Sequence, residues 1–122
     1  MITTPIHVID FEGSRQSGVV EYGVATLAAG SLTATDTRIC APVGTISDLD
    51  RAQHGISEEM AQGNEPFERE WSLFSRLREE GPFGAHNVAV EAGLLAMIWP
   101  CPKQCPNFAE PEIRAADWGP WL

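Results

Sequence analysis

The sequence predicts a single α/β domain, and three observations support this fold class. Extended segments rich in β-branched residues come first, capped helices fill the middle of the chain, and a short strand and another long helix follow. A chain of 122 residues, of which 43% are hydrophobic, can bury one sizeable core but not two. We therefore expect one mixed sheet flanked by helices.

The first segments predict an antiparallel start to the sheet. Residues 7–13 (HVIDFEG) and 18–27 (GVVEYGVATL) are expected to be strands, and the polar residues 14–17 between them predict a hairpin. A third strand is expected over 37–43 (TRICAPV), after a turn at 30–36. The sheet should thus begin with three consecutive antiparallel strands.

The middle of the chain predicts three helices. Ser47 and Ser57 are N-cap residues with acids in the following turn, so each should begin a short helix, on either side of the turn at 54–56. A longer helix is expected over 66–80, where Gly81-Pro82 ends it. Its core-facing residues recur at helical spacing: Phe67, Trp71, Phe74 and Leu77.

The last part predicts a short strand over 82–86 (PFGAH) and a helix over 88–99 (VAVEAGLLAMIW), with Asn87 as its N-cap. Residues 100–117 are mostly irregular and rich in proline, and 118–122 are expected to return to the core. The four tryptophans could in principle stack on bases, but we expect them to pack in the core.

Composition limits the classes of function. A net charge of −9 excludes a protein that holds duplex nucleic acid through its field alone, so metal ions would have to mediate such binding. We see no apolar run that could cross a bilayer and no export signal, and three cysteines is an odd number. We therefore expect free thiols, a cytoplasmic location and no membrane association. Cys101-x-x-x-Cys105 indicates zinc only weakly, because Cys40 is the one further thiol.

Two carboxylates share one face of the first strand. Asp10 and Glu12 alternate with residues of the opposite face, and two charges so close either raise a pKa or attract a cation. If the strand over 82–86 lies beside the first strand, the helix that follows brings Glu91 towards the pair. Three converging carboxylates suit Mg²⁺ or Mn²⁺ and the two-ion chemistry of phosphodiester cleavage.

These residues resemble the motifs of the DEDDh exonucleases, the DnaQ-like group of the ribonuclease H-like fold. Asp10-Phe11-Glu12 resembles the family's D-x-E motif, residues 54–56 (HGI) its H-G-I segment, and residues 86–91 (HNVAVE) its second motif, H-N-x-x-F-D. Residues 117–122 (DWGPWL) are similar to the stretch that leads into the family's next strand. The motifs occur in matching order along the whole chain, which makes the resemblance fairly specific.

The resemblance implies a ribonuclease H-like domain over 1–122 that removes nucleotides from a single-stranded 3′ end of DNA or RNA with two Mg²⁺ or Mn²⁺ ions. It implies that Asp10 bridges the ions, that Glu12 binds one ion and helps to orient the attacking water, and that Glu91 holds the second ion. The residues expected to contact substrate are Phe11, Gly13, Ser14, His54, Ile56, His86 and Asn87.

The sequence departs from the family pattern in two places. Glu91 stands where the family has aspartate, and the third motif, an H-x-x-x-x-D that supplies a general base and a metal ligand, has no counterpart. We therefore expect the chain to be the N-terminal part of such a domain, ending before its last strand and helix. Alone, it should bind divalent ions weakly, show little activity, and self-associate or bind a partner chain over the uncovered face.

Other interpretations remain open. The chain could be a non-catalytic interaction module that kept the fold, or a phosphoesterase acting on small nucleotides. Asp10 and Glu12 could be a solvated strand end, and Glu91 a favourable acid near a helix N-terminus. His54 could be a surface turn residue, and the 86–87 pair could serve capping and packing alone.

Overall fold

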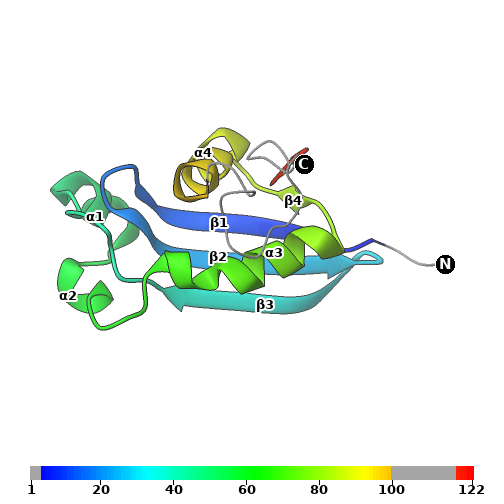
Figure 1. Ribbon diagram of the computed structural model, residues 1–122, viewed down its shortest axis with the longest axis horizontal. Helices are drawn as coiled ribbons and strands as arrows, with labels where there is room; N and C mark the ends of the chain where they lie inside the picture. The colour runs from blue at the N-terminus through cyan, green and yellow to red at the C-terminus, as the bar shows by residue number, and fades with distance from the viewer. Residues whose placement is uncertain (1–3, 100–117) are drawn as a thin grey trace.

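The computed structural model describes residues 4–99 and 118–122. Its strands are β1 (Ile6–Ser14), β2 (Gly18–Ala28), β3 (Ser31–Ile39) and β4 (Phe83–Gly84). They form one sheet in the order β3-β2-β1-β4, in which β1, β2 and β3 are successively antiparallel and β4 is parallel to β1 (Figure 1). The predicted mixed sheet, with an antiparallel start and a later parallel strand, is confirmed.

The helices follow the predicted order: α1 (Asp48–His54), α2 (Glu58–Ala61), a 3₁₀ segment η1 (Phe67–Glu70), α3 (Trp71–Glu80) and α4 (Val88–Ile98). Ser47 and Ser57 cap α1 and α2 through their hydroxyls, and Gly55 ends α1 in the left-handed conformation. Within the described ranges, none of these helices is long and apolar enough to span a membrane.

The third strand begins earlier than the sequence predicts. Ala29 and Gly30 both have positive φ, 53° and 78°, and this two-residue reversal lets β3 start at Ser31. The prediction of a turn over 30–36 and a strand over 37–43 is therefore wrong in its bounds. Its cause is the exposure of β3: an edge strand that buries neither face shows no alternation of apolar residues.

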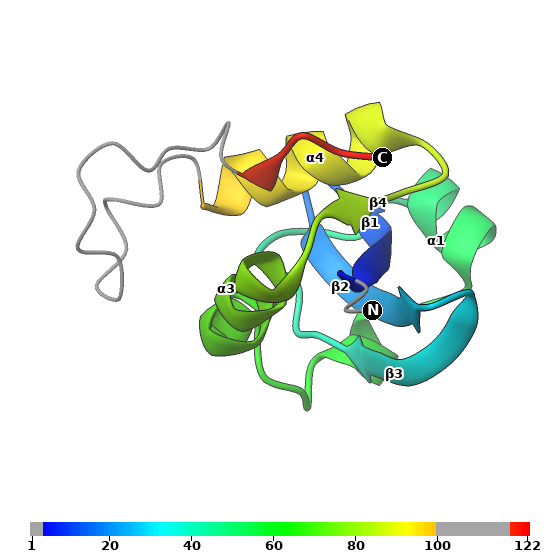
Figure 2. The same ribbon diagram turned by 90° about the vertical axis from the view of Figure 1, so that its right-hand side faces the viewer.

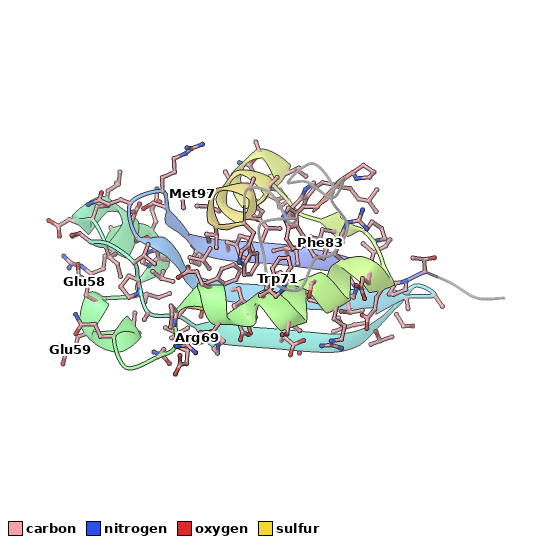
Figure 3. All side chains as sticks on the ribbon, viewed as in Figure 1. Glu58, Glu59, Arg69, Trp71, Phe83 and Met97 are labelled. Atoms are coloured by element: carbon pink, nitrogen blue, oxygen red, sulfur yellow. The ribbon has the colours of Figure 1, made fainter. Side chains whose placement is uncertain are left out.

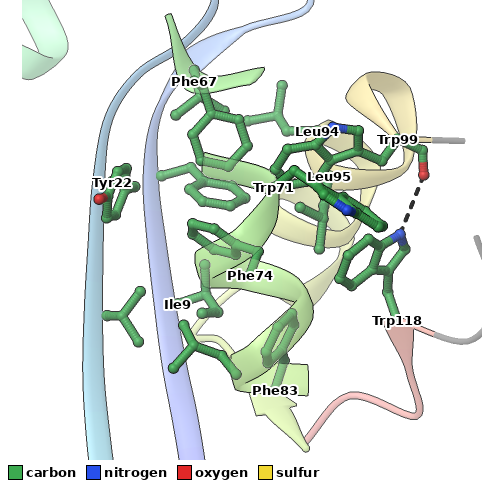
Figure 4. Packing of buried hydrophobic residues seen from close by; sticks show 14 of the residues in the cluster. Ile9, Tyr22, Phe67, Trp71, Phe74, Phe83, Leu94, Leu95, Trp99 and Trp118 are labelled. Carbon is green, nitrogen blue, oxygen red and sulfur yellow. Dashed lines mark hydrogen bonds between the residues drawn. The ribbon is translucent and has the colours of Figure 1, made fainter. Parts of the chain in front are cut away.

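The core lies between the sheet and the two long helices. Phe67 and Phe74 pack against each other with ring centroids 5.0 Å apart, and Trp118 donates its indole N–H to the Trp99 carbonyl over 3.2 Å (Figure 4). Trp71 and Phe83 lie between α3 and α4 in Figure 3. Three of the four tryptophans are buried and Trp121 packs against the cluster, so their predicted core role is confirmed.

The shortness of β4 determines where α4 lies. β4 pairs only with His7 and Val8, so the second half of β1 has no strand on that side, and α4 packs beside it (Figure 2). Asn87 occupies the N-cap position of α4, but its side chain makes no capping hydrogen bond, so the prediction of a side-chain cap is wrong. Because α4 packs beside the second half of β1, its first turns face the carboxylates of that strand.

Candidate active site

Side chains alternate along β1 between the core and the opposite face, which carries Asp10 and Glu12 and is called the acidic face below. Ile9 and Phe11 are buried in the core and His7 is fully buried, whereas Asp10 is exposed and Glu12 is half-buried. The predicted neighbourhood of Asp10 and Glu12 on one face, with His7 directed away from it, is confirmed. Neither carboxylate has to be taken fully out of water, so the fold tolerates both charges.

Glu91 comes from α4 to the same place and is only 5% exposed. Burial raises the pKa of the Glu91 carboxyl, and the charges of Asp10 and Glu12 raise it further. The backbone N–H of Phe11 acts in the opposite direction and lowers this pKa. The charges of the three predicted carboxylates therefore interact with one another, and Glu91 also interacts with the backbone of Phe11, the middle residue of the D-x-E segment.

The pKa of Glu12, on β1, is raised for the same two reasons, burial and nearby negative charge. Burial raises its pKa first, and the charge of Asp10 raises it further, while His54 lowers it. Glu21, directly opposite Glu12 in the β1–β2 register, adds another like charge. Glu21 was not predicted from the sequence, because a register shift between Glu12 and Gly13 places it, rather than Val20, across from Glu12.

His54 is a hydrogen-bond donor at this site. Its Nδ1 accepts the backbone N–H of Ile56 over 3.0 Å, so in the neutral ring the proton is on Nε2. Within residues 4–99 and 118–122, that buried Nε2 has no hydrogen-bond partner. Because its basic nitrogen is already engaged, neutral His54 can donate to a bound ligand but cannot readily accept a proton as a general base.

A groove of about 280 Å³ adjoins the acidic face. One wall is the β1–β2 turn, at Gly13, Ser14 and Arg15, and the other is the exposed side of α4. Gly13 has φ +143°, and a Cβ there would lie 2.0 Å from the Gly18 carbonyl oxygen, so only glycine fits. The Ser14 hydroxyl accepts the backbone N–H groups of residues 16 and 17 and so holds the turn.

The other predicted contact residues lie in different surroundings. Phe11 and Ile56 bury their side chains in the two hydrophobic clusters, so only their backbones reach the acidic face. His86 and Asn87 are exposed immediately before α4, and their side chains make no hydrogen bond to the rest of the described chain. The structure thus places Asp10, Glu12, Glu91 and His54 close enough for their charges to interact. His86 and Asn87 take no part in that group.

The donor set suits a hard divalent cation, because every carboxylate oxygen of Asp10, Glu12 and Glu91 is a ligand type that Mg²⁺ and Mn²⁺ prefer. In the part of the chain that the structure describes, however, no three His, Cys, Asp or Glu side chains lie close enough together to hold an ion. Cys101 and Cys105, whose spacing indicates zinc only weakly, lie outside the described residues.

The arrangement of sheet and helices is the ribonuclease H-like fold, which this chain shares with several solved exonuclease structures. Exonuclease X in complex with 5′ overhanging duplex DNA matches with a TM-score of 0.62 and 22% identity, over 73% of this chain and 52% of that one. Exonuclease I in complex with an inhibitor matches with a TM-score of 0.66 and 11% identity, over 82% and 25%. Cell-death related nuclease 4 matches with 0.64 and 10%, over 82% and 40%.

The chain spans about half of Exonuclease X and less of the other two proteins. No family model matches the sequence, and no curated protein matches it either. These similarities therefore show the fold, while the chemistry of this chain depends on its own residues.

Proposed function

We propose that this chain supplies three of the metal-binding carboxylates of a metal-dependent 3′–5′ exonuclease of the DEDDh type, which acts on single-stranded ends of DNA or RNA. The observation that supports this most is the buried Glu91, whose carboxyl is destabilised as an anion by burial and by the charges of Asp10 and Glu12. Such an arrangement is costly for folding alone, and a bound cation would offset the repulsion.

Each residue has a role in this proposal. The carboxylates of Asp10, Glu12 and Glu91 would have to draw closer together than they lie in the described chain to hold Mg²⁺ or Mn²⁺, which when bound supplies Lewis-acid stabilisation of the phosphodiester and a more acidic water. His54 donates its Nε2 proton to an oxygen of the bound strand. The groove beside Gly13 receives a nucleotide, and the exposed position of the 86–87 pair leaves it free to contact the strand.

The sequence contains no H-x-x-x-x-D, so the 122-residue chain should cleave slowly by itself. A general base typically contributes about 10²- to 10⁴-fold in rate. We also propose a cytoplasmic location, which is compatible with the free, buried thiol of Cys40, whose pKa burial raises to about 11.

Hydrolysis of a single-stranded oligonucleotide labelled at either end tests the proposal. With Mg²⁺ or Mn²⁺ we expect slow release of the 3′ label, acceleration by added imidazole acting as a base, and loss of both on Asp10→Asn. Glu91→Asp should retain much of the rate and Glu91→Gln should lose most of it.

Three results would contradict the proposal. Cleavage that Asp10→Asn leaves unchanged would remove the metal role, and cleavage only of dinucleotides or mononucleotide esters would favour a small-nucleotide phosphoesterase. Oligonucleotide binding that ignores divalent ions, with no cleavage even in imidazole, would favour a non-catalytic interaction module.

A further inference from the structure

Arg15 differs from the other arginines of the described chain. Those at 38, 51, 69, 76 and 78 each pair with an acid or donate to a backbone carbonyl. Across residues 4–99 and 118–122, Arg15 is the one arginine with no ion pair and no hydrogen bond from its guanidinium, and its side chain is exposed. In a chain with a net charge of −9, this uncommitted cation needs an explanation.

The backbone that carries Arg15 is firmly held. The Ser14 hydroxyl accepts two backbone N–H groups of the turn, and the buried Ser17 hydroxyl donates to the Gly18 carbonyl over 2.9 Å. The Val43 N–H adds a hydrogen bond of 2.9 Å to the Ser17 carbonyl. Arg15 therefore projects from a fixed position, and little backbone entropy is lost when it binds a ligand.

Arg15 lines the groove, and the carboxylates do not. The opposite wall is Ala89, Val90, Gly93 and Leu94 of α4, and none of Asp10, Glu12 or Glu91 borders the space. At Gly93 an added Cβ would meet nothing within 4 Å, so the groove is open there. A cation beside an apolar wall suits a nucleoside with its phosphate, at a place next to the acidic face and separate from it.

We propose that Arg15 is a specificity residue that binds a phosphate of the nucleic acid strand other than the phosphate that is cleaved. This inference rests on the proposed function, because it takes the cleaved phosphate to lie at the carboxylates. The adjoining nucleoside occupies the groove against α4, and Arg15 pairs with the phosphate at its rim. Strands with two or more phosphates are then preferred over dinucleoside monophosphates, which can present only the cleaved phosphate.

Arginine is suited to this task. Its guanidinium offers a planar fork that matches phosphate oxygens, and it remains charged at every working pH. The acidic face next to the groove repels a polyanion, and a cation at the rim reduces that repulsion where the strand enters.

The test uses short single-stranded oligonucleotides in which one phosphate at a time is replaced by a neutral methylphosphonate. Binding is measured with Ca²⁺ in place of Mg²⁺, so that binding is separated from cleavage. For the wild type, one position other than the cleaved linkage should weaken binding roughly 3- to 10-fold. Arg15→Gln should bind more weakly by the same factor and become insensitive to replacement at that position.

Matched variants separate this effect from general charge and from folding. Arg69→Gln removes one charge from an exposed residue of η1 that does not border the groove, and should leave the pattern unchanged. Gly93→Leu should fill the groove and weaken binding at least as much as Arg15→Gln. Gly93→Ala should bind nearly as the wild type does, while its helix gains stability.

The outcomes are distinct. Arg15→Gln that keeps the wild-type sensitivity at every phosphate overturns the role of Arg15 and leaves the proposed function intact, provided that the wild type binds. A wild type that binds no oligonucleotide overturns both. Equal losses for Arg15→Gln and Arg69→Gln would reduce the effect to net charge and would also contradict the proposal.

Discussion

The backbone N–H of Phe11 lowers the pKa of the Glu91 carboxyl, an interaction between the open edge of β1 and helix α4. Phe11 stands between Asp10 and Glu12, so this interaction links Glu91 to the strand segment that carries the other two carboxylates. It exists because β4 stops after pairing with Val8 and leaves that N–H unpaired by any strand. The candidate site is thus a consequence of a short strand.

The first prediction concerns Glu91→Gln. The folded-state pKa of Glu91 is raised, so its contribution to stability is fully present below the unfolded pKa and is lost as the pH rises through the folded value. At pH 7 the neutral amide should therefore stabilise the fold by on the order of 1 kcal/mol, because it removes a charge from a buried position. Urea unfolding at pH 4 and pH 7 measures this.

The control for that experiment is Glu59→Gln, a change at an exposed residue of α2. The gain from Glu91→Gln should be larger at pH 7 than at pH 4, and the control should show no such difference. A Glu91→Gln variant that is less stable than the wild type at pH 7 would mean that the buried charge supports the fold.

Much of this site follows from the sequence, and the rest depends on long-range register. Alternation places Asp10 and Glu12 together, and the order of strand and helix brings Glu91 to them, because both rules are local or topological. Glu21 depends on the hairpin register, and Arg15 becomes informative only once its lack of a partner is known. β3 was misplaced because an exposed edge strand need not alternate.

The second prediction concerns the tautomer of His54. Long-range ¹H–¹⁵N spectra above the titration of the ring should show the proton on Nε2, since Nδ1 accepts the Ile56 N–H. His54→Asn should keep that acceptor and the fold, and it should slow oligonucleotide cleavage by roughly 10-fold, the scale of one lost hydrogen bond. A proton on Nδ1 would refute the assignment.

The third prediction concerns His7, which is fully buried with its Nδ1 2.8 Å from the Thr26 hydroxyl and its Nε2 3.4 Å from Glu80. Burial lowers the pKa of His7, while Glu80 opposes the shift and Arg76 adds to it slightly. With a depressed folded pKa, its stabilising contribution is present above the unfolded value near 6.5 and is lost as the pH falls.

Thermal unfolding between pH 5 and pH 8 tests this sign. The wild type should lose stability below about pH 6.5, by on the order of 1 kcal/mol from this group. His7→Gln should flatten that part of the curve, and the exposed His86→Gln should not. If His86→Gln has the same effect as His7→Gln, the acid sensitivity does not come from burial.

The fourth prediction concerns the link between the sheet and η1. The Tyr22 hydroxyl donates to Glu70, and Arg38 pairs with the same carboxylate over 3.7 Å while it lies 5.9 Å from the centre of the Tyr22 ring. Tyr22→Phe should cost about 1–2 kcal/mol of unfolding free energy. A double-mutant cycle with Glu70→Gln should show a coupling above about 0.5 kcal/mol, whereas exposed Glu68→Gln should add independently.

The most direct test of the central claim is a titration of the ¹⁵N-labelled chain with Mn²⁺, whose paramagnetism broadens amide signals near the bound ion. If Asp10, Glu12 and Glu91 form a cation site, the first amides to broaden should be those of residues 9–13 and 88–92, and Asp10→Asn should remove that selectivity. Broadening that begins instead at the exposed Glu59 of α2, or that Asp10→Asn leaves unchanged, would contradict the account.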